Sequence, residues 1–510
     1  MKNLNLSISR TLFFIRIGFV AALLFSFVSC GSSSSGDNVS TNDAASSASN
    51  NGAGNTGSSA GNTSNTQKIK FLSATDGVSG YELWKTDGTL TGTALVKDIN
   101  IGGDSYPQGF VEFKGERYFQ ANDGINGIEL WKTDGTADGT TLVKKINTTG
   151  GSSSPANFTV LNDMLYFKAN DGVNGYELWK TDGSSSGTMM VKNINPIAGA
   201  DSLSYSYDDF TVFNGAIYFA ADDGTDGIEL WKTDGTPAGT VMVKNINTAA
   251  GASSNPAEFT EFKGALYFRA DDGVNGDELW KTDGTEVGTV LVKDINTIGP
   301  EPGASSIPGG FKVFNGVLYF AANDGVHAQG VELWKTDGTA DGTVMVKDIN
   351  IHGDGSYPAN LTVFNGALYF RANDGVTGPE LWKTDGTVTG TVLVKDIFSG
   401  PGSGSWPSDF TELNGVLYFQ ANDGASPAEL WKTDGTPEGT VLVTAIKNSI
   451  GKDAAPAFFK VFNNALFFTA RDGVNGREFW KTDGTADGTQ LLKDICPGSC
   501  DGPQSYSGMN

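Results

Sequence analysis

The sequence predicts an all-β fold, a closed β-propeller of about nine four-stranded blades, on three observations. The heptapeptide ELWKTDG, or EFWKTDG in the last copy, recurs nine times at intervals of 47 to 54 residues, and a period of this size is typical of repeat architectures. Each repeat holds four strand-like runs, except that the first repeat lacks one run and the tail of the chain matches it. The repeated tryptophans are Trp84, Trp131, Trp179, Trp231, Trp280, Trp334, Trp382, Trp431 and Trp480.

The repeat at 361–397, LTVFNGALYFRANDGVTGPELWKTDGTVTGTVLVKDI, represents the predicted blade. Four runs rich in Val, Phe, Tyr, Leu and Trp predict short strands. Asn365 and Gly366 are a two-residue hairpin signal, and NDGVTG and TDGTVTG predict longer turns. The link to the next repeat varies most in length, as expected where the chain travels from the outer edge of one sheet to the inner edge of the next.

The two ends of the repeat region predict how the ring is closed. The first repeat begins at KIKFLSATDG, which matches the second strand of the other repeats. In the tail, Pro503 and Tyr506 align with Pro155 and Phe158 at the start of a first strand. We expect residues near Tyr506 to pair with the strand at 69–72 and complete the ninth blade, which leaves no exposed sheet edge. An open arc and two smaller rings are the alternatives, because propellers usually have four to eight blades.

The first 30 residues follow different rules from the repeats. Lys2, Arg10 and Arg16 precede or flank an apolar run that is short for a membrane-spanning helix, and the segment ends in FVSC. This order is typical of a bacterial export signal. The ending resembles the lipobox of bacterial lipoproteins, which implies that Cys30 carries the lipid. The alternative is a cleaved secretory signal with an incidental cysteine.

Residues 31–67 are almost entirely Ser, Gly, Asn, Thr and Ala. Such a segment cannot bury enough apolar surface to offset the entropy of ordering, so we expect a flexible tether with a reach of about 35 Å. By resemblance to lipoprotein sorting signals, Gly31 after the cysteine favours the outer membrane or the cell surface over the inner membrane. The domains are therefore a signal at 1–30, a tether at 31–67 and a propeller at 68–510.

Cysteine usage and charge limit the possible partners. In an exported protein, Cys496 and Cys500 most simply form a local disulfide, and a zinc site would need soft ligands beyond His327 and His352. The formal net charge of −23 argues against nucleic acid and against a basic membrane-docking patch. The membrane is therefore expected to be a partner only through the lipid.

The repeated motif is expected to be architectural. Both faces of a blade pack against neighbours, so each blade needs a large apolar side chain at an equivalent place, and a buried Trp hides about 150 to 250 Å². Strand alternation puts Glu380 and Trp382 on one side and Lys383 on the other. We expect the glutamate of one blade to meet the lysine of the next.

The repeats resemble the bacterial ELWxxDGT repeat family of exported proteins, with nine motif copies over residues 68–510. A looser similarity is to the tryptophan-docking propellers of quinoprotein dehydrogenases and of a barrel-assembly lipoprotein. Their spacing is approached by ANDGVNGYELW, from Ala169 to Trp179, with Asn174 in place of Thr and Tyr176 in place of Lys. This looser similarity implies quinone-dependent chemistry, whereas the repeat family implies no particular reaction.

Three sets of residues are candidates for a site. Asn170, Asp171, Asn174 and Glu177 offer oxygen ligands of the type that calcium accepts, but glycine-rich turns use the same residues without an ion. Loops between blades carry aromatic residues that suit sugar or peptide binding, with packing under the loop as the alternative; these are Tyr106, Tyr205, Tyr207, Tyr357 and Trp406. Carboxylates before the inner strands could serve a glycosidase; these are Asp209, Glu258 and Asp409.

These observations predict a non-catalytic surface lipoprotein, most simply a monomer without a cofactor, that binds a protein or a glycan. A broad face built from loops suits such a partner better than a small buried substrate. The alternative is a propeller enzyme of the quinone-dependent dehydrogenase or the glycosidase or lyase type. A nucleophilic triad needs a placed base, and His327 and His352 lie in turn-like stretches without a nucleophile motif.

Overall fold

The computed structural model describes residues 69–203, 210–298, 304–326, 330–400, 402–425, 428–446 and 454–503. All of them belong to the compact unit Asn65–Asn510. The described residues form strands and turns, and none of their segments is a helix long and apolar enough to cross a membrane. The predicted signal, Cys30 and the tether lie outside the described residues.

The strands form nine antiparallel sheets, each of which is consecutive in the chain. The first four sheets are β1(Lys70–Ala74), β2(Glu82–Thr86), β3(Ala94–Lys97); β4(Gln108–Phe113), β5(Glu116–Asn122), β6(Ile128–Thr133), β7(Thr141–Lys144); β8(Ala156–Leu161), β9(Met164–Asn170), β10(Tyr176–Thr181), β11(Met189–Lys192); β12(Thr211–Phe213), β13(Ala216–Asp222), β14(Ile228–Thr233), β15(Val241–Lys244).

The other five sheets repeat the same order. They are β16(Ala257–Phe262), β17(Ala265–Asp271), β18(Asp277–Thr282), β19(Val290–Lys293); β20(Gly309–Phe314), β21(Val317–Asn323), β22(Val331–Thr336), β23(Val344–Lys347); β24(Ala359–Phe364), β25(Ala367–Asn373), β26(Pro379–Thr384), β27(Val392–Lys395); β28(Ser408–Leu413), β29(Val416–Ala421), β30(Glu429–Thr433), β31(Val441–Thr444); β32(Ala457–Phe462), β33(Ala465–Arg471), β34(Arg477–Thr482), β35(Gln490–Lys493).

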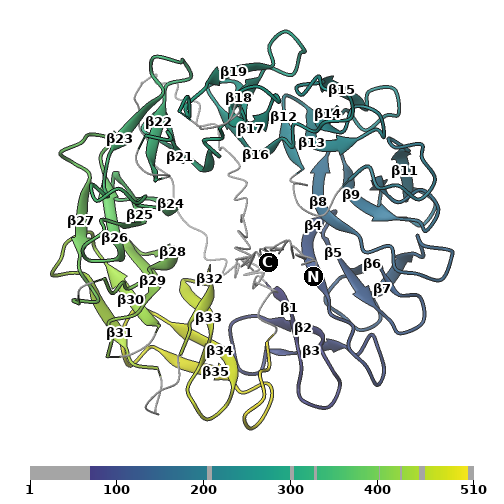
Figure 1. The fold of residues 1–510 in the computed structure, drawn as a ribbon. Helices are drawn as coiled ribbons and strands as arrows, with labels where there is room; N and C mark the ends of the chain where they lie inside the picture. The colour runs from purple at the N-terminus through teal and green to yellow at the C-terminus, as the bar shows by residue number, and fades with distance from the viewer. Residues whose placement is uncertain are drawn as a thin grey trace, which may run out of the picture. The chain divides into compact units, whose positions relative to one another are not determined.

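The nine sheets are the blades of a propeller, as the sequence predicts (Figure 1). We number them blade 1 to blade 9 in chain order. The first strand of each four-stranded blade lies toward the centre of the ring and the fourth lies at the outside. Since each blade is an antiparallel meander, the 1–2 and 3–4 hairpins lie on one face of the ring. The 2–3 turns and the links between blades lie on the other face, which we call the link face.

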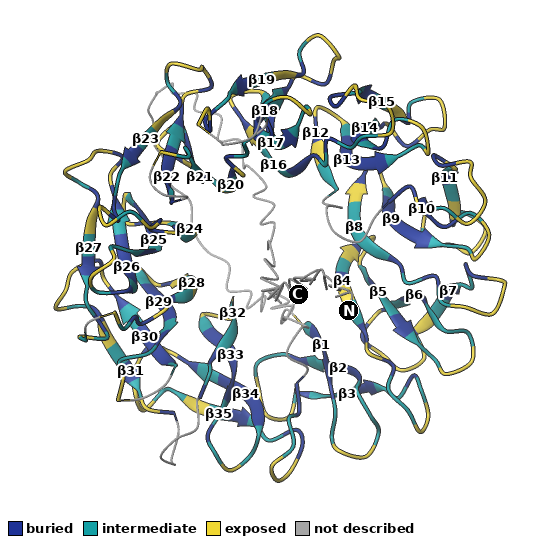
Figure 2. Cartoon of the chain, in the orientation of Figure 1, coloured by how far each residue is buried: buried dark blue, intermediate teal, exposed yellow. Residues whose placement is uncertain are grey.

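The hydrophobic core lies between blades. Nine clusters of buried residues each join one blade to the next, and the cluster around Leu72 and Phe479 joins blade 9 to blade 1. All nine repeated tryptophans are buried in these clusters. Figure 2 shows that exposed residues gather in the loops, with buried residues in the strands. One ring of nine blades follows, in place of two smaller rings.

The turn after each tryptophan strand explains the TDGTxxGT part of the motif. In blade 7, the Asp385 carboxylate accepts the N–H and the hydroxyl of Thr387, at 2.8 and 2.7 Å. The Thr387 hydroxyl accepts the N–H of Gly390 at 2.9 Å, and the hydroxyls of Thr384 and Thr391 lie 2.7 Å apart. The turn thus satisfies its own polar groups, which is the usual use of Asp and Thr in turns.

Lysines join each blade to the following one. Lys383 of blade 7 donates to the carbonyl of Gly435 in blade 8 at 2.9 Å, and Lys395 donates to that of Thr440 at 2.7 Å. The prediction that the glutamate of one blade meets the lysine of the next is wrong. The buried Glu380 instead accepts the N–H groups of Ile397 and Ser405 at 3.1 and 2.9 Å, because the chain that leaves its own blade folds back over it.

The two ends of the described repeat region meet between blade 9 and blade 1. Blade 1 has three strands among the described residues. The N–H of Thr75 donates to the carbonyl of Gly502 at 2.8 Å, just as Asn170 donates to Ser153 at 3.0 Å. This bond puts Gly502 at the place of Ser153, so Pro503 lies one residue earlier than its alignment with Pro155 predicts. Tyr506 lies outside the described residues.

Candidate ligand-binding face

The link face carries a set of equivalent residues at the entrance to the innermost strands. Each follows a small buried residue and precedes a proline, and each has a positive φ between 41° and 51°. We call them the mouth residues: Tyr106, Ser154, Asn255, Ile307, Tyr357, Trp406 and Ala455. Left-handed backbone is uncommon for residues with side chains, above all for bulky and β-branched ones, so the fold imposes the same strain in seven blades.

Hydrogen bonds hold the backbone at these positions. The N–H of Tyr357 donates to the carbonyl of Val331 in the preceding blade at 3.0 Å, and the other mouth residues make the same bond at 3.0 to 3.2 Å. The preceding Ser356 donates its N–H and its hydroxyl to the buried Glu332, at 2.9 and 2.6 Å. Burial raises the pKa of Glu332. The glutamate of the repeated motif thus holds the residue that precedes Tyr357 in place.

Three of the sequence-predicted aromatic residues are mouth residues with exposed side chains. Tyr357 is 56% exposed, Trp406 54% and Tyr106 40%. Tyr205 and Tyr207 lie outside the described residues, and the equivalent position in their link is the buried Leu203, whose N–H bonds to Tyr176. The structure thus leaves three aromatic side chains available at the mouth. About half of each of these side chains is nonetheless covered, so packing in the loop and exposure to solvent occur together.

A fourth large mouth residue is aliphatic and was not among the sequence-predicted residues. Ile307 is 56% exposed, and with Tyr357 and Trp406 it forms an arc over blades 6, 7 and 8. Its signal in the sequence is that it precedes a proline, Pro308, just as each of the three aromatic residues precedes a proline. Among the described mouth residues, only those of blades 6, 7 and 8 form such a run of large apolar side chains. The others are small or polar, except Tyr106.

Two contacts set the orientation of the aromatic side chains. Tyr106 stacks on Tyr81 with ring centroids 5.5 Å apart. The guanidinium of Arg371 in β25 lies 5.2 Å from the ring centroid of Trp406 in the next blade. Arg371 is a second residue that sequence reasoning overlooked, because its strand position is occupied by many residue types in the other repeats.

The two candidate carboxylates among the described residues, Glu258 and Asp409, lie in different blades. Glu258 and Asp409 both occupy a bulge of an innermost strand, at positive φ, but in blades 5 and 8. Glu258 accepts the N–H of Gly310 in the next blade at 3.2 Å. Desolvation raises the pKa of Asp409, whose side chain is exposed. Asp209 lies outside the described residues.

The candidate calcium ligands are used by the protein itself. The Asp171 carboxylate accepts N–H groups of Val173 and Asn174 at 2.8 Å, and the Asn174 amide donates back to it. Glu177 is fully buried, and its carboxylate accepts the backbone N–H of Ile194 at 2.8 Å. Within the described residues, no group of three or more His, Cys, Asp or Glu side chains could hold a metal ion. Asp171, Asn174 and Glu177 thus bond to the turn and the link of their own blade.

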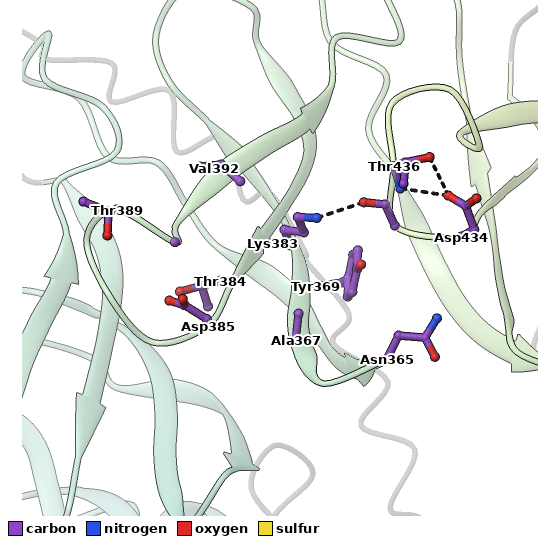
Figure 3. Close-up of a pocket in the computed structure, with 12 residues that line it drawn as sticks. Asn365, Ala367, Tyr369, Lys383, Thr384, Asp385, Thr389, Val392, Asp434 and Thr436 are labelled. Atoms are coloured by element: carbon purple, nitrogen blue, oxygen red, sulfur yellow. Dashed lines mark hydrogen bonds between the residues drawn. The ribbon is translucent and has the colours of Figure 1, made fainter.

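A depression of about 480 Å³ lies between blades 7 and 8, on the face that carries the 1–2 and 3–4 hairpins (Figure 3). Its walls include Asn365, Tyr369, Lys383 and Asp434. Lys383 bonds across it to Gly435, and similar bonds join other blades. This depression is the ordinary seam between two blades and not a dedicated pocket.

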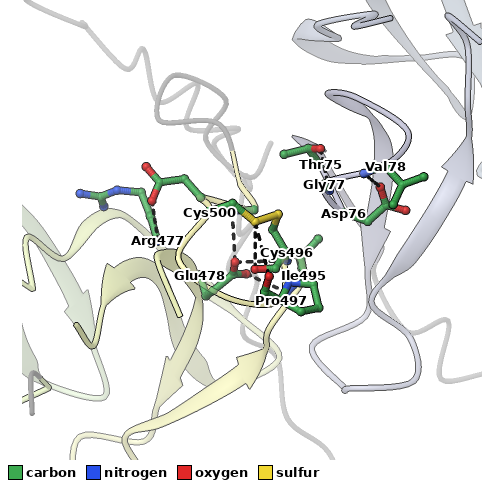
Figure 4. Close-up of a disulfide and its surroundings, with 12 residues drawn as sticks. Thr75, Asp76, Gly77, Val78, Arg477, Glu478, Ile495, Cys496, Pro497 and Cys500 are labelled. Atoms are coloured by element: carbon green, nitrogen blue, oxygen red, sulfur yellow. Dashed lines mark hydrogen bonds between the residues drawn. A yellow bond between two sulfur atoms is a disulfide. The ribbon is translucent and has the colours of Figure 1, made fainter. Parts of the chain in front are cut away.

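The predicted cysteine pair lies near the join between blade 9 and blade 1 (Figure 4). Cys496 and Cys500 form a disulfide. The buried Glu478 accepts the N–H groups of Ile495 and Cys496 at 2.8 and 3.2 Å, and a Cβ on Gly77 of blade 1 would lie 3.0 Å from the Cys496 sulfur. The disulfide is thus a structural element of this join.

Comparisons with known proteins give one family match. The Calx-beta domain family matches residues 208–279 and 361–427, which together are less than half of the chain. Each match begins near the first strand of one blade and extends into the next blade, so it does not correspond to a single sheet here. No match was found among curated proteins.

Solved structures give distant likenesses. A puromycin hydrolase is 14% identical, with a TM-score of 0.38, over 69% of this chain and 54% of that one. Prolyl oligopeptidase B from Galerina marginata is 12% identical, TM-score 0.39, over 67% and 50%. Oligopeptidase B from Leishmania major is 11% identical, TM-score 0.38, over 72% and 53%. The chain spans about half the length of these proteins, and such likenesses establish no activity for it.

Proposed function

We propose that the protein is a non-catalytic scaffold that binds a protein or glycan partner through the link face. The observation that carries this proposal is the exposure of Tyr106, Ile307, Tyr357 and Trp406 at one equivalent, strained backbone position. Strain of about 1 to 3 kcal/mol per residue persists only where the surroundings enforce it, and it clusters at functional sites. Exposed aromatic side chains on a rigid support are the usual anchors of an interface.

Mutagenesis of the mouth tests this proposal. The triple variant Tyr106→Ala, Tyr357→Ala, Trp406→Ala is expected to lose binding to glycans that the parent protein captures on an array. The matched control changes Val78, Val376 and Ile125 to Ala, because these side chains are also exposed but lie in the 2–3 turns. Equal binding by both triple variants, with unchanged melting curves, would refute the role of the mouth.

We propose further that the protein is exported and held at the outer membrane or cell surface through a lipid on Cys30. The order of basic start, apolar run, cysteine and polar tether supports this. Cys30→Ser should move the protein from the membrane fraction to the soluble fraction. Retention in the membrane fraction after this change would rule out the lipid anchor.

The finer part of the fold is also a proposal, namely that the tail after Pro503 supplies the missing strand of blade 1. The Thr75 to Gly502 bond and the bridge between Ala74 and Pro503 support it, because the same bond precedes each other innermost strand. Deletion of 504–510 should lower the melting temperature in one cooperative transition and promote association through the exposed edge. A truncated protein as stable and monomeric as the parent would contradict this closure.

A further inference from the structure

Two blades carry an arginine at the same place in the second strand, but among the described residues only one of these arginines has an acidic partner. Arg269 of blade 5 pairs with the Asp277 carboxylate at 3.7 Å. In blade 7, Arg371 takes the place of Arg269, and Pro379 takes the place of Asp277. The substitution of proline for aspartate removes the carboxylate that neutralises the first arginine.

The N–H donors of the Arg371 guanidinium are therefore unpaired among the described residues. Within the described part of the chain, it has no hydrogen bond and no ion pair, and its close contact is the ring of Trp406. Its side chain is half-buried, and burial lowers its pKa, but an arginine stays charged at neutral pH. A partly desolvated charge without a counter-charge is unfavourable, so the site is suited to accept an anion.

One exposed aromatic side chain of the mouth contacts this charge, and a second precedes the strand that pairs with β25. The ring of Trp406 lies over one side of the guanidinium. The backbone N–H of Trp406 donates to the carbonyl of Pro379 at 3.0 Å. Tyr357 lies two residues before Ala359, which pairs with Arg371 across the ladder. The charged fork thus meets one aromatic ring, and the strand pairing puts Tyr357 at the same edge of the ring.

We propose that Arg371, Trp406 and Tyr357 form a binding subsite for a carboxylate-bearing sugar, such as a uronic acid residue of a glycan. Arginine binds a carboxylate with two parallel hydrogen bonds, and the aromatic rings offer flat faces to the sugar. The net charge of −23 repels densely charged chains, so we expect a glycan whose carboxylates are sparse or terminal. This inference rests on the proposed binding role of the mouth.

The test compares tri-galacturonate with its methyl ester, which keeps the sugar and removes the charge. Titration calorimetry on the full-length protein should give about tenfold tighter binding of the acid, equal to about 1.4 kcal/mol. Arg371→Met should reduce this preference to within about twofold, and so should Pro379→Asp, which restores the carboxylate found in blade 5. The matched controls Arg269→Met and Pro379→Ala should keep the preference.

Each other outcome has a definite meaning. Equal binding of acid and ester by the parent, with loss of both in Trp406→Ala, would overturn the carboxylate subsite and leave the mouth as a binding face. Loss of preference in Arg269→Met as well would show a general charge effect and overturn the assignment to Arg371. Binding of a peptide with a free C-terminal carboxylate, but of neither sugar, would overturn the saccharide assignment. Circular dichroism melting curves for every variant exclude misfolding as the cause.

Discussion

The join between blades 8 and 9 lacks a contact that the other joins have, and this predicts the effect of Thr444→Lys. In the other eight blades the equivalent lysine donates to a threonine carbonyl of the next blade, at distances such as 2.7 Å for Lys395 to Thr440. Four of these lysines also lie over the next tryptophan, 5.5 to 5.9 Å from the ring centroid. Thr444 cannot make either contact, and Trp480 beyond it is, at 9%, the most exposed of the nine tryptophans.

The expected gain follows from three terms. A hydrogen bond from a charged donor contributes about 1.5 to 3 kcal/mol, and a cation over an aromatic ring at a partly exposed site adds about 0.5 to 1 kcal/mol. Ordering a lysine side chain costs up to about 2 kcal/mol. We therefore expect Thr444→Lys to raise the free energy of unfolding by about 1 kcal/mol, with Lys395→Thr lowering it by a similar amount.

Urea denaturation is the suitable assay, since urea does not screen charges and the midpoint changes at constant slope when only stability changes. Hydrogen exchange of β31 and β32 should slow in Thr444→Lys, because the local join opens less often. If both variants keep the parent midpoint, the lysine contacts do not contribute to the joins. If Thr444→Lys is destabilising, blades 8 and 9 lie in a different geometry from the other pairs.

Three further predictions concern the joins. Trp382→Ala should lower the free energy of unfolding, measured by urea denaturation, by about 3 to 5 kcal/mol, as is usual for a buried aromatic side chain. A loss below about 1 kcal/mol would mean that neighbouring side chains move in to fill the cavity. Gly435→Ala should destabilise the protein by about 1 kcal/mol or more, because φ is 99° and the new Cβ would lie 2.3 Å from the Tyr369 hydroxyl; Tyr369→Phe should recover part of this loss, and no recovery would leave the backbone conformation as the cause. Burial raises the pKa of Glu177 and Glu278 to about 7 and that of Glu478 to about 8. The folded state then binds more protons than the unfolded state above about pH 5, so the free energy of unfolding should fall as pH rises from about 5 to 8, and a rise would contradict the direction of these shifts.

The sequence predicted most of the architecture because repetition reveals it. The spacing of the tryptophans, the Asn365–Gly366 hairpin and the four strand-like runs are local patterns, and the structure confirms the all-β fold and the nine blades. The partner of Glu380 was predicted wrongly, because alternation along a strand tells which side a residue faces and not which loop folds over it. The carboxylate is satisfied by Ser405, which is far from it in sequence and adjacent only in the folded link.

The candidate site could be predicted only in part. The place before a proline identified Tyr106, Tyr357 and Trp406, but the restriction to aromatic residues missed Ile307. Arg371 could not be recognised from its own repeat. That Arg371 lacks a carboxylate partner follows only from the pairing of β25 with β26, which puts Pro379 where blade 5 has Asp277. Differences between equivalent positions become informative once the ladder register is known.

The lysine contacts between described blades all run in the same direction around the ring. Each blade donates to its successor and accepts from its predecessor, so every join is head to tail, and blade 9 meets blade 1 in this same sense through Lys493 and the carbonyl of Thr93. Such a heterologous interface does not by itself fix the number of blades, since the donating side of any blade fits the accepting side of any other. Gene duplication could therefore add or remove a blade without inventing a contact, limited only by the angle at which the last blade reaches the first.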